Sequence, residues 1–281
     1  MKEIKLEVNF KKMSNSKILS FDTELRNLNK IFESEDFSIA VSGGIDSLIL
    51  SILASKIKQK QINIFHAVSP AVQKDGTKRT RLYAKKYNWN LKVINADEFS
   101  DSNYLKNPRN RCFYCKFNLY KKIKQYTSEK IYSGTNYSDL SDFRPGLDAA
   151  KEYNIRHPFV EAKITKTMIR EFAKNYGLNS LASLPAQPCL SSRIYTGIEI
   201  DKLILDKIYL AEKKIQTLIN SKITRCRFGK TFIKIELDNL SFLNLTRINK
   251  RKIEDIIKKL FEKKIIIYFS EYKMGSTFLV D

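Results

Sequence analysis

This chain has no long apolar runs and few cysteines. These two features argue against a membrane-spanning protein and against a disulfide-stabilised one. Four cysteines in 281 residues are too few for a disulfide framework, so they are better interpreted as chemistry. No apolar run approaches the roughly 20 residues that a membrane span needs. The charged start Met1–Glu7 also lacks the apolar core of a signal peptide. We therefore expect a cytoplasmic protein with no membrane partner.

Acidic residues are outnumbered by basic ones, 30 against 51, which gives a formal net charge of +21. A charge of this size is typical of proteins that bind nucleic acid. Lysine, isoleucine and asparagine are abundant along the whole chain, however, and this favours a compositional bias over a dedicated basic patch. Charge alone therefore leaves both interpretations open.

Two common phosphate-binding motifs are absent: the Gly-Lys-Ser/Thr ending of a Walker A loop and the G-x-G-x-x-G fingerprint. The chain has instead Ser-Gly-Gly-Ile-Asp-Ser at residues 42–47. This segment lies between an apolar run at 37–41, predicted as a buried strand, and a predicted helix at 48–56. Adjacent glycines allow a sharp turn and a close backbone approach, and a helix start attracts anions. The sequence therefore predicts a phosphate cradle.

Further predicted strands alternate with helices, which indicates an α/β protein with a doubly wound parallel sheet. The strands are expected at 62–68, 91–96 and 130–133, and the helices at 21–32, 74–87, 111–126 and 165–176. Ligands of such sheets bind at the carboxyl ends of the strands. Loop 42–47, the strand end at 66–68 and Gly134–Asn136 all belong to that edge. His66 lies on it, whereas His157, which precedes a proline, is predicted to be structural.

The helix–strand rhythm breaks at residues 183–188, where two prolines occur, and we place a domain boundary there. The expected domains are 1–184, which carries the loop, and 185–281, a small α+β domain. Its expected elements are a helix at 201–220, strands at 223–228 and 231–237, a helix at 247–263 and a strand at 265–269. Phe228-Gly-Lys-Thr231 is a hairpin signal.

The cysteines fall in three places. Cys112 and Cys115 form a C-x-x-C motif at the start of a helix, which alone is compatible with a redox pair, half a zinc site or two buried thiols. Cys189 precedes Arg193 in a proline-flanked loop, and such electropositive surroundings favour a thiolate. Cys226 lies between two arginines on a predicted strand, so it should point away from them and pack in the interior.

Arg225 and Arg227, which flank Cys226, share one face of that strand and suit a phosphate group. Glu212 and Glu236 could contact a substrate or Mg²⁺, but charged residues on helices and strands are usually solvated, and we expect that here.

Taken together, these segments resemble one branch of the N-type ATP pyrophosphatases, the LarE-type ATP-dependent sulfur transferases. The resemblance runs from about residue 20 to 240, and four further segments carry it in order: 107–116, 134–136, 142–146 and 189–194. It implies an adenine nucleotide alpha hydrolase-like fold that binds ATP and Mg²⁺. The implied ATP-binding residues are Ala40, Ser42, Gly43, Gly44, Asp46, Ser47, His66, Ala67, Gly134, Thr135 and Asn136.

The resemblance also implies a two-step reaction in the biosynthesis of the nickel-pincer nucleotide cofactor of lactate racemase. A carboxylate of pyridinium-3,5-biscarboxylic acid mononucleotide attacks ATP, and a sulfur nucleophile then displaces AMP to leave a thiocarboxylate. The implied catalytic residues are Cys189, Asp46 and Arg193, and Arg225 and Arg227 are implied to bind the phosphate of this small nucleotide substrate. A sulfide source and a homo-oligomer are further expectations.

The source of the sulfur leaves alternatives open. One form of the family has cysteines matching Cys112, Cys115 and Cys189 that hold a [4Fe-4S] cluster, whose fourth iron binds hydrosulfide. Another form sacrifices the cysteine at the position of Cys189. All three cysteines are present here, and cluster irons take thiolate ligands, so the cluster form is favoured over a sacrificial cysteine, zinc or inert thiols. Rival functions are tRNA thiolation, an amidotransferase-like use of ATP and a cluster-carrying scaffold.

Overall fold

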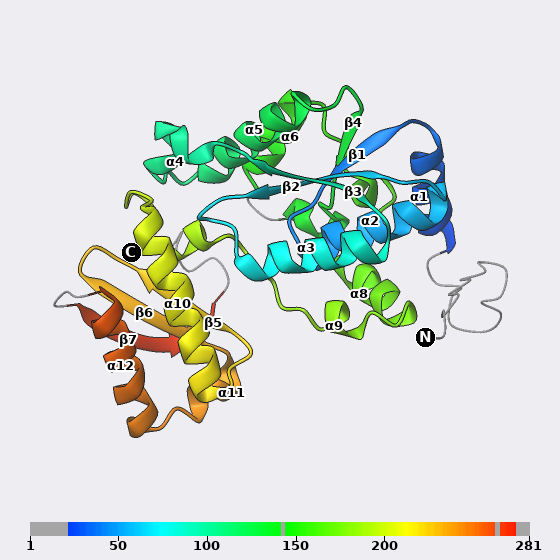
Figure 1. The fold of residues 1–281 in the computed structure, drawn as a ribbon. Coiled ribbons are helices and arrows are strands. Elements are labelled where there is room, and N and C mark those ends of the chain that lie inside the picture. The colour runs from blue at the N-terminus through cyan, green and yellow to red at the C-terminus, as the bar shows by residue number, and fades with distance from the viewer. Residues whose placement is uncertain (1–21, 142–143, 262–264, 274–281) are drawn as a thin grey trace.

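The computed structural model describes residues 22–141, 144–261 and 265–273. A sheet of four parallel strands in the order β3-β2-β1-β4 lies at its centre (Figure 1). The strands are β1 (Phe37–Ala40), β2 (Asn63–Val68), β3 (Asn90–Asn95) and β4 (Lys130–Ser133). The predicted parallel α/β sheet is confirmed, and each predicted strand is present within one or two residues.

Helices cover both faces of this sheet, as the doubly wound prediction requires (Figure 1). They are α1 (Asp22–Glu33), α2 (Ile45–Lys58), α3 (Lys74–Lys86), α4 (Ser102–Leu105), α5 (Arg111–Lys124), α6 (Gly146–Glu152), α7 (Pro158–Glu161), α8 (Lys166–Asn175) and α9 (Asn179–Ala182). Some predicted positions lie outside the described residues. They are residue 21 of the predicted helix 21–32, residue 142 of the motif 142–146 and residue 263 of the predicted helix 247–263.

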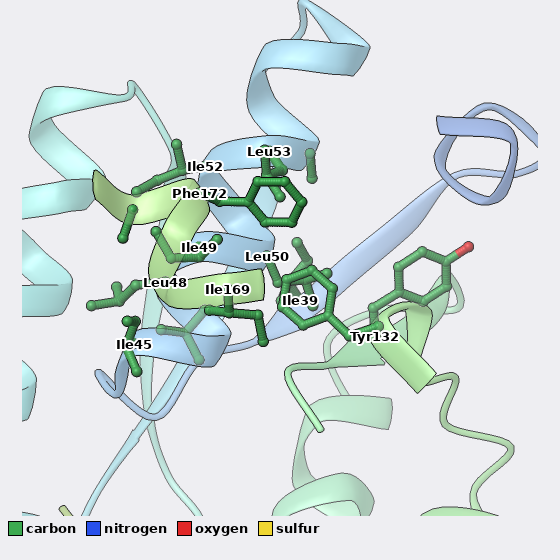
Figure 2. Close-up of a cluster of buried hydrophobic side chains, with 14 of the residues drawn as sticks. Ile39, Ile45, Leu48, Ile49, Leu50, Ile52, Leu53, Tyr132, Ile169 and Phe172 are labelled. Carbon is green, nitrogen blue, oxygen red and sulfur yellow. The ribbon is translucent and has the colours of Figure 1, made fainter. Parts of the chain in front are cut away.

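Side-chain alternation along the strands builds two cores, one under each layer of helices. Ile39 and Tyr132 point to the face covered by α2 and α8, where Figure 2 shows them beside Leu50 and Phe172. Phe65 and Ile131 point to the face covered by α5 and α6. Each large apolar side chain that leaves water contributes about 1.5–3 kcal/mol. Both layers are therefore tightly fixed to the sheet.

The strand order creates the position for a ligand. The chain leaves β3 at one edge of the sheet and returns as β4 on the far side of β1. Ala40, the last residue of β1, aligns with Phe65 of β2 and Ser133 of β4, so the three strands end at one edge. Connections diverge on either side of β1, which is where open α/β sheets bind ligands.

A second, three-stranded sheet follows in the order β5-β6-β7. Strands β5 (Thr224–Phe228) and β6 (Phe232–Leu237) form the predicted antiparallel hairpin, and β7 (Ile266–Glu271) runs parallel to β6. Its helices are α10 (Lys202–Ile219), α11 (Asn239–Leu243) and α12 (Arg247–Phe261). Cys226 is fully buried in the core that α10 and α12 share with this sheet, as predicted.

Residues 184–189 form neither helix nor strand. They lead from α9 to a short 3-10 helix, η4 (Leu190–Arg193), ahead of the second sheet. None of the helices in the described ranges combines the length and the apolar character that crossing a membrane requires.

Candidate active site

The turn between β1 and α2 depends on a glycine at its tip. Gly43 has a φ of +81°, which disfavours any residue with a Cβ. A Cβ at Gly43 would also lie 2.4 Å from the carbonyl oxygen of Gly76 in the first turn of α3. Two glycine backbones are therefore in direct contact, and α3 closes one side of the loop.

Two serine hydroxyls hold the shape of this turn. The Oγ atoms of Ser42 and Ser47 lie 3.3 Å apart, and the backbone N–H of Gly44 donates to Ser42 Oγ at 3.3 Å. The backbone N–H of Ser42 donates to Ser47 Oγ at 3.2 Å. The turn is thus organised before any ligand binds, which lowers the entropic cost of binding.

The start of α2 faces the same opening. The first N–H groups of a helix have no partner within it, and no side chain caps α2 in the described chain. Gly44 occupies the N-cap position, and Asp46 lies in the first turn. Free N–H groups and the helix dipole favour a phosphate, as the sequence predicted. The carboxylate of Asp46 adds the oxygen donor that Mg²⁺ prefers.

The end of β4 forms the opposite wall of the opening. A Cβ at Gly134 would lie 2.6 Å from the backbone nitrogen of Ser47, so this glycine lets β4 approach the start of α2. Asn136 is buried, and its Nδ2 donates to Asp46 Oδ1 at 3.4 Å and to Asp139 Oδ2 at 3.0 Å. The hydroxyl of Thr135 lies 3.3 Å from that of Ser133. The structure thus brings the predicted Gly134–Asn136 segment to loop 42–47.

Other predicted nucleotide-binding residues lie behind this surface. His66 is fully buried, with Nδ1 2.8 Å from the Val41 carbonyl oxygen and Nε2 2.9 Å from Thr77 Oγ1. Burial lowers the pKa of this imidazole, so the ring is neutral. Its contact with Val41 supports the residue just before loop 42–47. Ala40 and Ala67 pack against the core under α5.

His157 also has a structural environment, as predicted. Its Nδ1 lies 2.8 Å from Ser133 Oγ, and burial lowers the pKa of the imidazole to about 4, with a smaller contribution from the charge of Lys116.

The three cysteines of the predicted cluster come from two elements. Cys112 and Cys115 lie in the first turns of α5, and Cys189 directly precedes η4. All three are half-buried. Burial raises the pKa of the Cys112 and Cys115 thiols, and the charge of a Cys189 thiolate raises both further. Arg111 and Lys116 oppose this for Cys112. The Cys112 and Cys115 thiols both sense a charge at Cys189, and Cys115 and Cys189 pack against the same apolar core, so the two elements bring these cysteines near one another.

A single metal ion finds no ready site here, because among the described residues no three His, Cys, Asp or Glu side chains form a group that could hold one. A [4Fe-4S] cluster is much larger than an ion, and its ligands surround it at its corners. Three thiols would match the donors of such a cluster in number and type, and would leave one of its four irons without a protein ligand.

Arg193 organises the loop that carries Cys189. Its side chain is fully buried, and Nε and Nη2 donate to the two carboxylate oxygens of Glu212 at 2.9 and 3.1 Å. Its Nη1 donates to the carbonyl oxygens of Pro188 and Cys189 at 2.9 and 3.2 Å. Glu212 Oε1 also accepts from the backbone N–H of Cys226 at 2.9 Å. The guanidinium is thus committed to the protein, and its contacts fix the backbone of Cys189 onto α10 and β5.

The predicted arginine pair does lie on one face of β5. Arg227 donates through Nε to Glu236 Oε2 at 2.8 Å and through Nη1 to the Ser192 carbonyl oxygen at 2.9 Å. Arg225 donates to the carbonyl oxygens of Thr224 and Ala186. Glu212 and Glu236 are both buried, so the expectation that they are solvated is wrong. Each neutralises a buried arginine that would otherwise lose its hydration uncompensated.

Arg225 has unused binding capacity. Its Nε is buried without a hydrogen-bond partner in the described chain, and burial together with the charge of Arg193 lowers the pKa of the guanidinium to about 10. Arg225 lines a cavity of about 180 Å³ between α3, residues 185–187 and α10, which Lys213 and Lys222 also line. Lys213 forms an ion pair with Asp75, which also lines the cavity, so an anion there would depend mainly on Arg225 and Lys222.

Two connecting residues escaped the sequence analysis. Arg79 of α3 donates through Nε to the Gly43 carbonyl oxygen at 3.0 Å and through Nη2 to Gln187 Oε1, so it links loop 42–47 to the segment before Cys189. Lys166, the first residue of α8, forms an ion pair with Asp46 at 2.5 Å. Neither lies in a motif, and basic residues on helices are too common in this chain to single them out.

The fold defines an α/β protein with a Rossmann-like parallel sheet and a small mixed sheet on its C-terminal side. No protein-family model matches the chain. It is 37% identical over 254 residues to uncharacterised protein MJ0830 of Methanocaldococcus jannaschii, covering 88% of this chain and 94% of that protein. It is 32% identical over 221 residues to uncharacterised protein slr1717 of Synechocystis, covering 77% and 82% of the two chains. The chain therefore belongs to the family of these two proteins.

A more distant relative carries a functional name. The chain is 26% identical over 205 residues to the pyridinium-3,5-bisthiocarboxylic acid mononucleotide synthase of Lactiplantibacillus plantarum, covering 71% of this chain and 74% of the synthase. This likeness supports the LarE-type resemblance seen in the sequence, and with it a sulfur-transferring enzyme.

Proposed function

We propose that this protein is an ATP-dependent sulfur transferase that converts a carboxylate of pyridinium-3,5-biscarboxylic acid mononucleotide into a thiocarboxylate. The observation that carries the proposal is the junction between the phosphate loop and the Cys189 loop. Helix α3 and the segment before it contact both: Arg79 joins Gly43 to Gln187, and the N–H of Leu190 donates to the carbonyl oxygen of Ala71, just before α3, at 2.8 Å. A nucleotide-activating loop next to a cysteine is what activation followed by sulfur transfer requires.

In the first step ATP binds at loop 42–47. The N–H groups at the start of α2 and the hydroxyls of Ser42 and Ser47 hold phosphate oxygens. Asp46 would hold Mg²⁺, which would neutralise the phosphate charge. A substrate carboxylate oxygen attacks the α-phosphorus, the bond to the bridging oxygen breaks, and pyrophosphate leaves with that electron pair. The product is an acyl adenylate. Residues pre-arranged to receive the charge of the leaving group supply most of the catalysis.

The substrate phosphate is proposed to bind in the cavity that Arg225 lines. The guanidinium of Arg225 and the ammonium of Lys222 would supply donors for a dianion, and Lys213 would add a third on leaving Asp75. Glu236, opposite Arg225 on β6, and its partner Arg227 on β5 support that position. Arg193, with its donors occupied, acts as a positioning residue that holds the backbone of Cys189.

In the second step hydrosulfide sulfur attacks the acyl carbon, and AMP leaves with the electron pair of the carbon–oxygen bond. A [4Fe-4S] cluster held by Cys112, Cys115 and Cys189 would supply bound hydrosulfide at its open iron. The sacrificial alternative uses Cys189 itself: its thiolate attacks the acyl carbon and displaces AMP to give a thioester. Loss of the Cα proton then breaks the Cβ–Sγ bond, so sulfur stays on the product and dehydroalanine remains.

Exchange of labelled pyrophosphate into ATP tests the proposal. The biscarboxylate mononucleotide should stimulate the exchange in the full chain. Arg225→Lys, which keeps the charge but loses the planar fork, should weaken that stimulation about tenfold and leave ATP binding unchanged. Lys230→Ala at the exposed hairpin tip is the matched control and should match the parent protein. Stimulation by unmodified tRNA instead, with a steep salt dependence, would establish the tRNA-thiolating rival.

The protein's mass after reaction with sulfide separates the two sulfur sources. Repeated turnover at constant mass supports hydrosulfide as the donor. A loss of about 34 Da at Cys189 after one turnover identifies a sacrificial cysteine.

A further inference from the structure

Lys166 places its ammonium group directly against the loop carboxylate. Its Nζ lies 2.5 Å from Asp46 Oδ2, and the two side chains are 33% and 24% exposed. Both groups thus lie at the surface of the opening, where a ligand can reach them. The second carboxylate oxygen of Asp46 accepts only the longer bond from Asn136, so Lys166 is its principal partner among the described residues.

The backbone of Lys166 is fixed, whereas its head group is not. Thr165 caps α8 by accepting from the N–H of Met168 at 3.4 Å, and the N–H of Lys166 donates to Ser138 Oγ at 3.2 Å. Ile169 and Phe172, on the following turns of α8, pack into the core beside α2 (Figure 2). A lysine has four flexible methylene groups and a compact charge. The ammonium can therefore move within the opening while its anchor stays in place.

The ammonium of Lys166 and a magnesium ion compete for the carboxylate of Asp46. Mg²⁺ demands near-ideal octahedral oxygen ligands, so its binding removes the carboxylate from Lys166. The displaced ammonium then faces the nearest negative charge, which in the occupied loop belongs to the polyphosphate. Such a charge at the α-phosphate or the leaving pyrophosphate stabilises the charge that develops there.

Resting on the function proposed above, we infer that Lys166 is a phosphate-contacting residue that holds Asp46 in the empty site and transfers its ammonium to ATP when Mg²⁺ takes that carboxylate. Replacing Lys166 should therefore affect metal binding and ATP binding in opposite directions. Removing the ammonium frees Asp46 for a metal ion and also removes a phosphate contact. A residue with a purely structural role would weaken both kinds of binding together.

The test uses Lys166→Met in the full chain, with Lys174→Met on the exposed face of the same helix as the control. Binding of Mn²⁺ without nucleotide, followed by its paramagnetic signal, should tighten about threefold in Lys166→Met. Binding of Mg·ATP, followed by calorimetry, should weaken about tenfold. Lys166→Arg keeps the charge and should restore most of the Mg·ATP affinity. Lys174→Met should change neither.

Two results would overturn the inference: unchanged Mg·ATP binding in Lys166→Met, or parallel weakening of Mn²⁺ and Mg·ATP. The parent protein separates this failure from a failure of the proposed function. If the parent binds no Mg·ATP, the proposed function is wrong; if the parent binds it and Lys166→Met binds it equally well, only the role of Lys166 is wrong.

Discussion

The phosphate loop and the Cys189 loop are built by opposite means. Loop 42–47 takes its shape from backbone: a glycine at positive φ, two glycine backbones in contact, and unpaired N–H groups at a helix start. The Cys189 loop takes its shape from long buried side chains, chiefly the Arg193–Glu212 pair. The first design relies on backbone geometry and close backbone contact, whereas the second joins distant elements through buried full charges. Damage to each region should therefore show itself differently.

The largest expected effect is on stability, at the charged region. Arg193→Met leaves Glu212 buried without its partner, and removing one member of a buried ion pair costs about 3–5 kcal/mol. Denaturant unfolding should show this loss. Adding Glu212→Gln to Arg193→Met should recover part of it, because the uncompensated charge is gone. A free energy of unfolding for Arg193→Met within about 1 kcal/mol of the parent would show that the Cys189 loop does not depend on this ion pair.

At the backbone-built region, binding should suffer more than stability. Gly43→Ala adds a Cβ at positive φ and 2.4 Å from the Gly76 carbonyl oxygen. We expect about 1–3 kcal/mol of destabilisation and a loss of ATP binding of tenfold or more, measured by calorimetry. Gly177→Ala is the matched control: its φ is +68°, but a Cβ there meets nothing within 4 Å in the described chain. Equal ATP affinity in the two variants would show that the Gly43–Gly76 contact is dispensable.

The smallest effect concerns pH. The thiol pKa values of Cys112 and Cys115 are raised by burial and by Cys189, so the unfolded chain releases these protons first as pH rises. The two thiols contribute their full share to the free energy of unfolding below about pH 8.5. Above that pH, each thiol's contribution declines by up to about 1.4 kcal/mol per pH unit. Iron-free protein should accordingly alkylate slowly at both positions at neutral pH. Rates equal to those of guanidinium-unfolded protein would contradict the burial argument.

The same contrast explains what the sequence could predict. Loop 42–47 and its flanking strand and helix are contiguous, and the parallel sheet follows from alternating elements, so both were accessible from local pattern. The hairpin at Gly229 followed from its turn signal, and the inward direction of Cys226 followed from strand alternation.

Contacts between distant segments were not accessible in this way. Lys166 meets Asp46 across 120 residues, and only the packing of α8 on α2 brings them together. The burial of Glu212 and Glu236 depends on arginines arriving from other elements. A charged residue on a helix or strand carries no local sign that a partner will cover it.

The contact between Gly43 and Gly76 has a mechanical consequence. Side chains that touch can absorb a displacement by changing rotamer, but two bare backbones have no such slack. Any shift of the loop tip is therefore transmitted undiminished to the first turn of α3. That turn is preceded by Ala71, whose carbonyl oxygen holds Leu190, and it is followed by Arg79, which holds Gln187. The loop tip and the start of α3 should thus move together, and their motion reaches the segment around Cys189 through one backbone hydrogen bond and one side-chain contact.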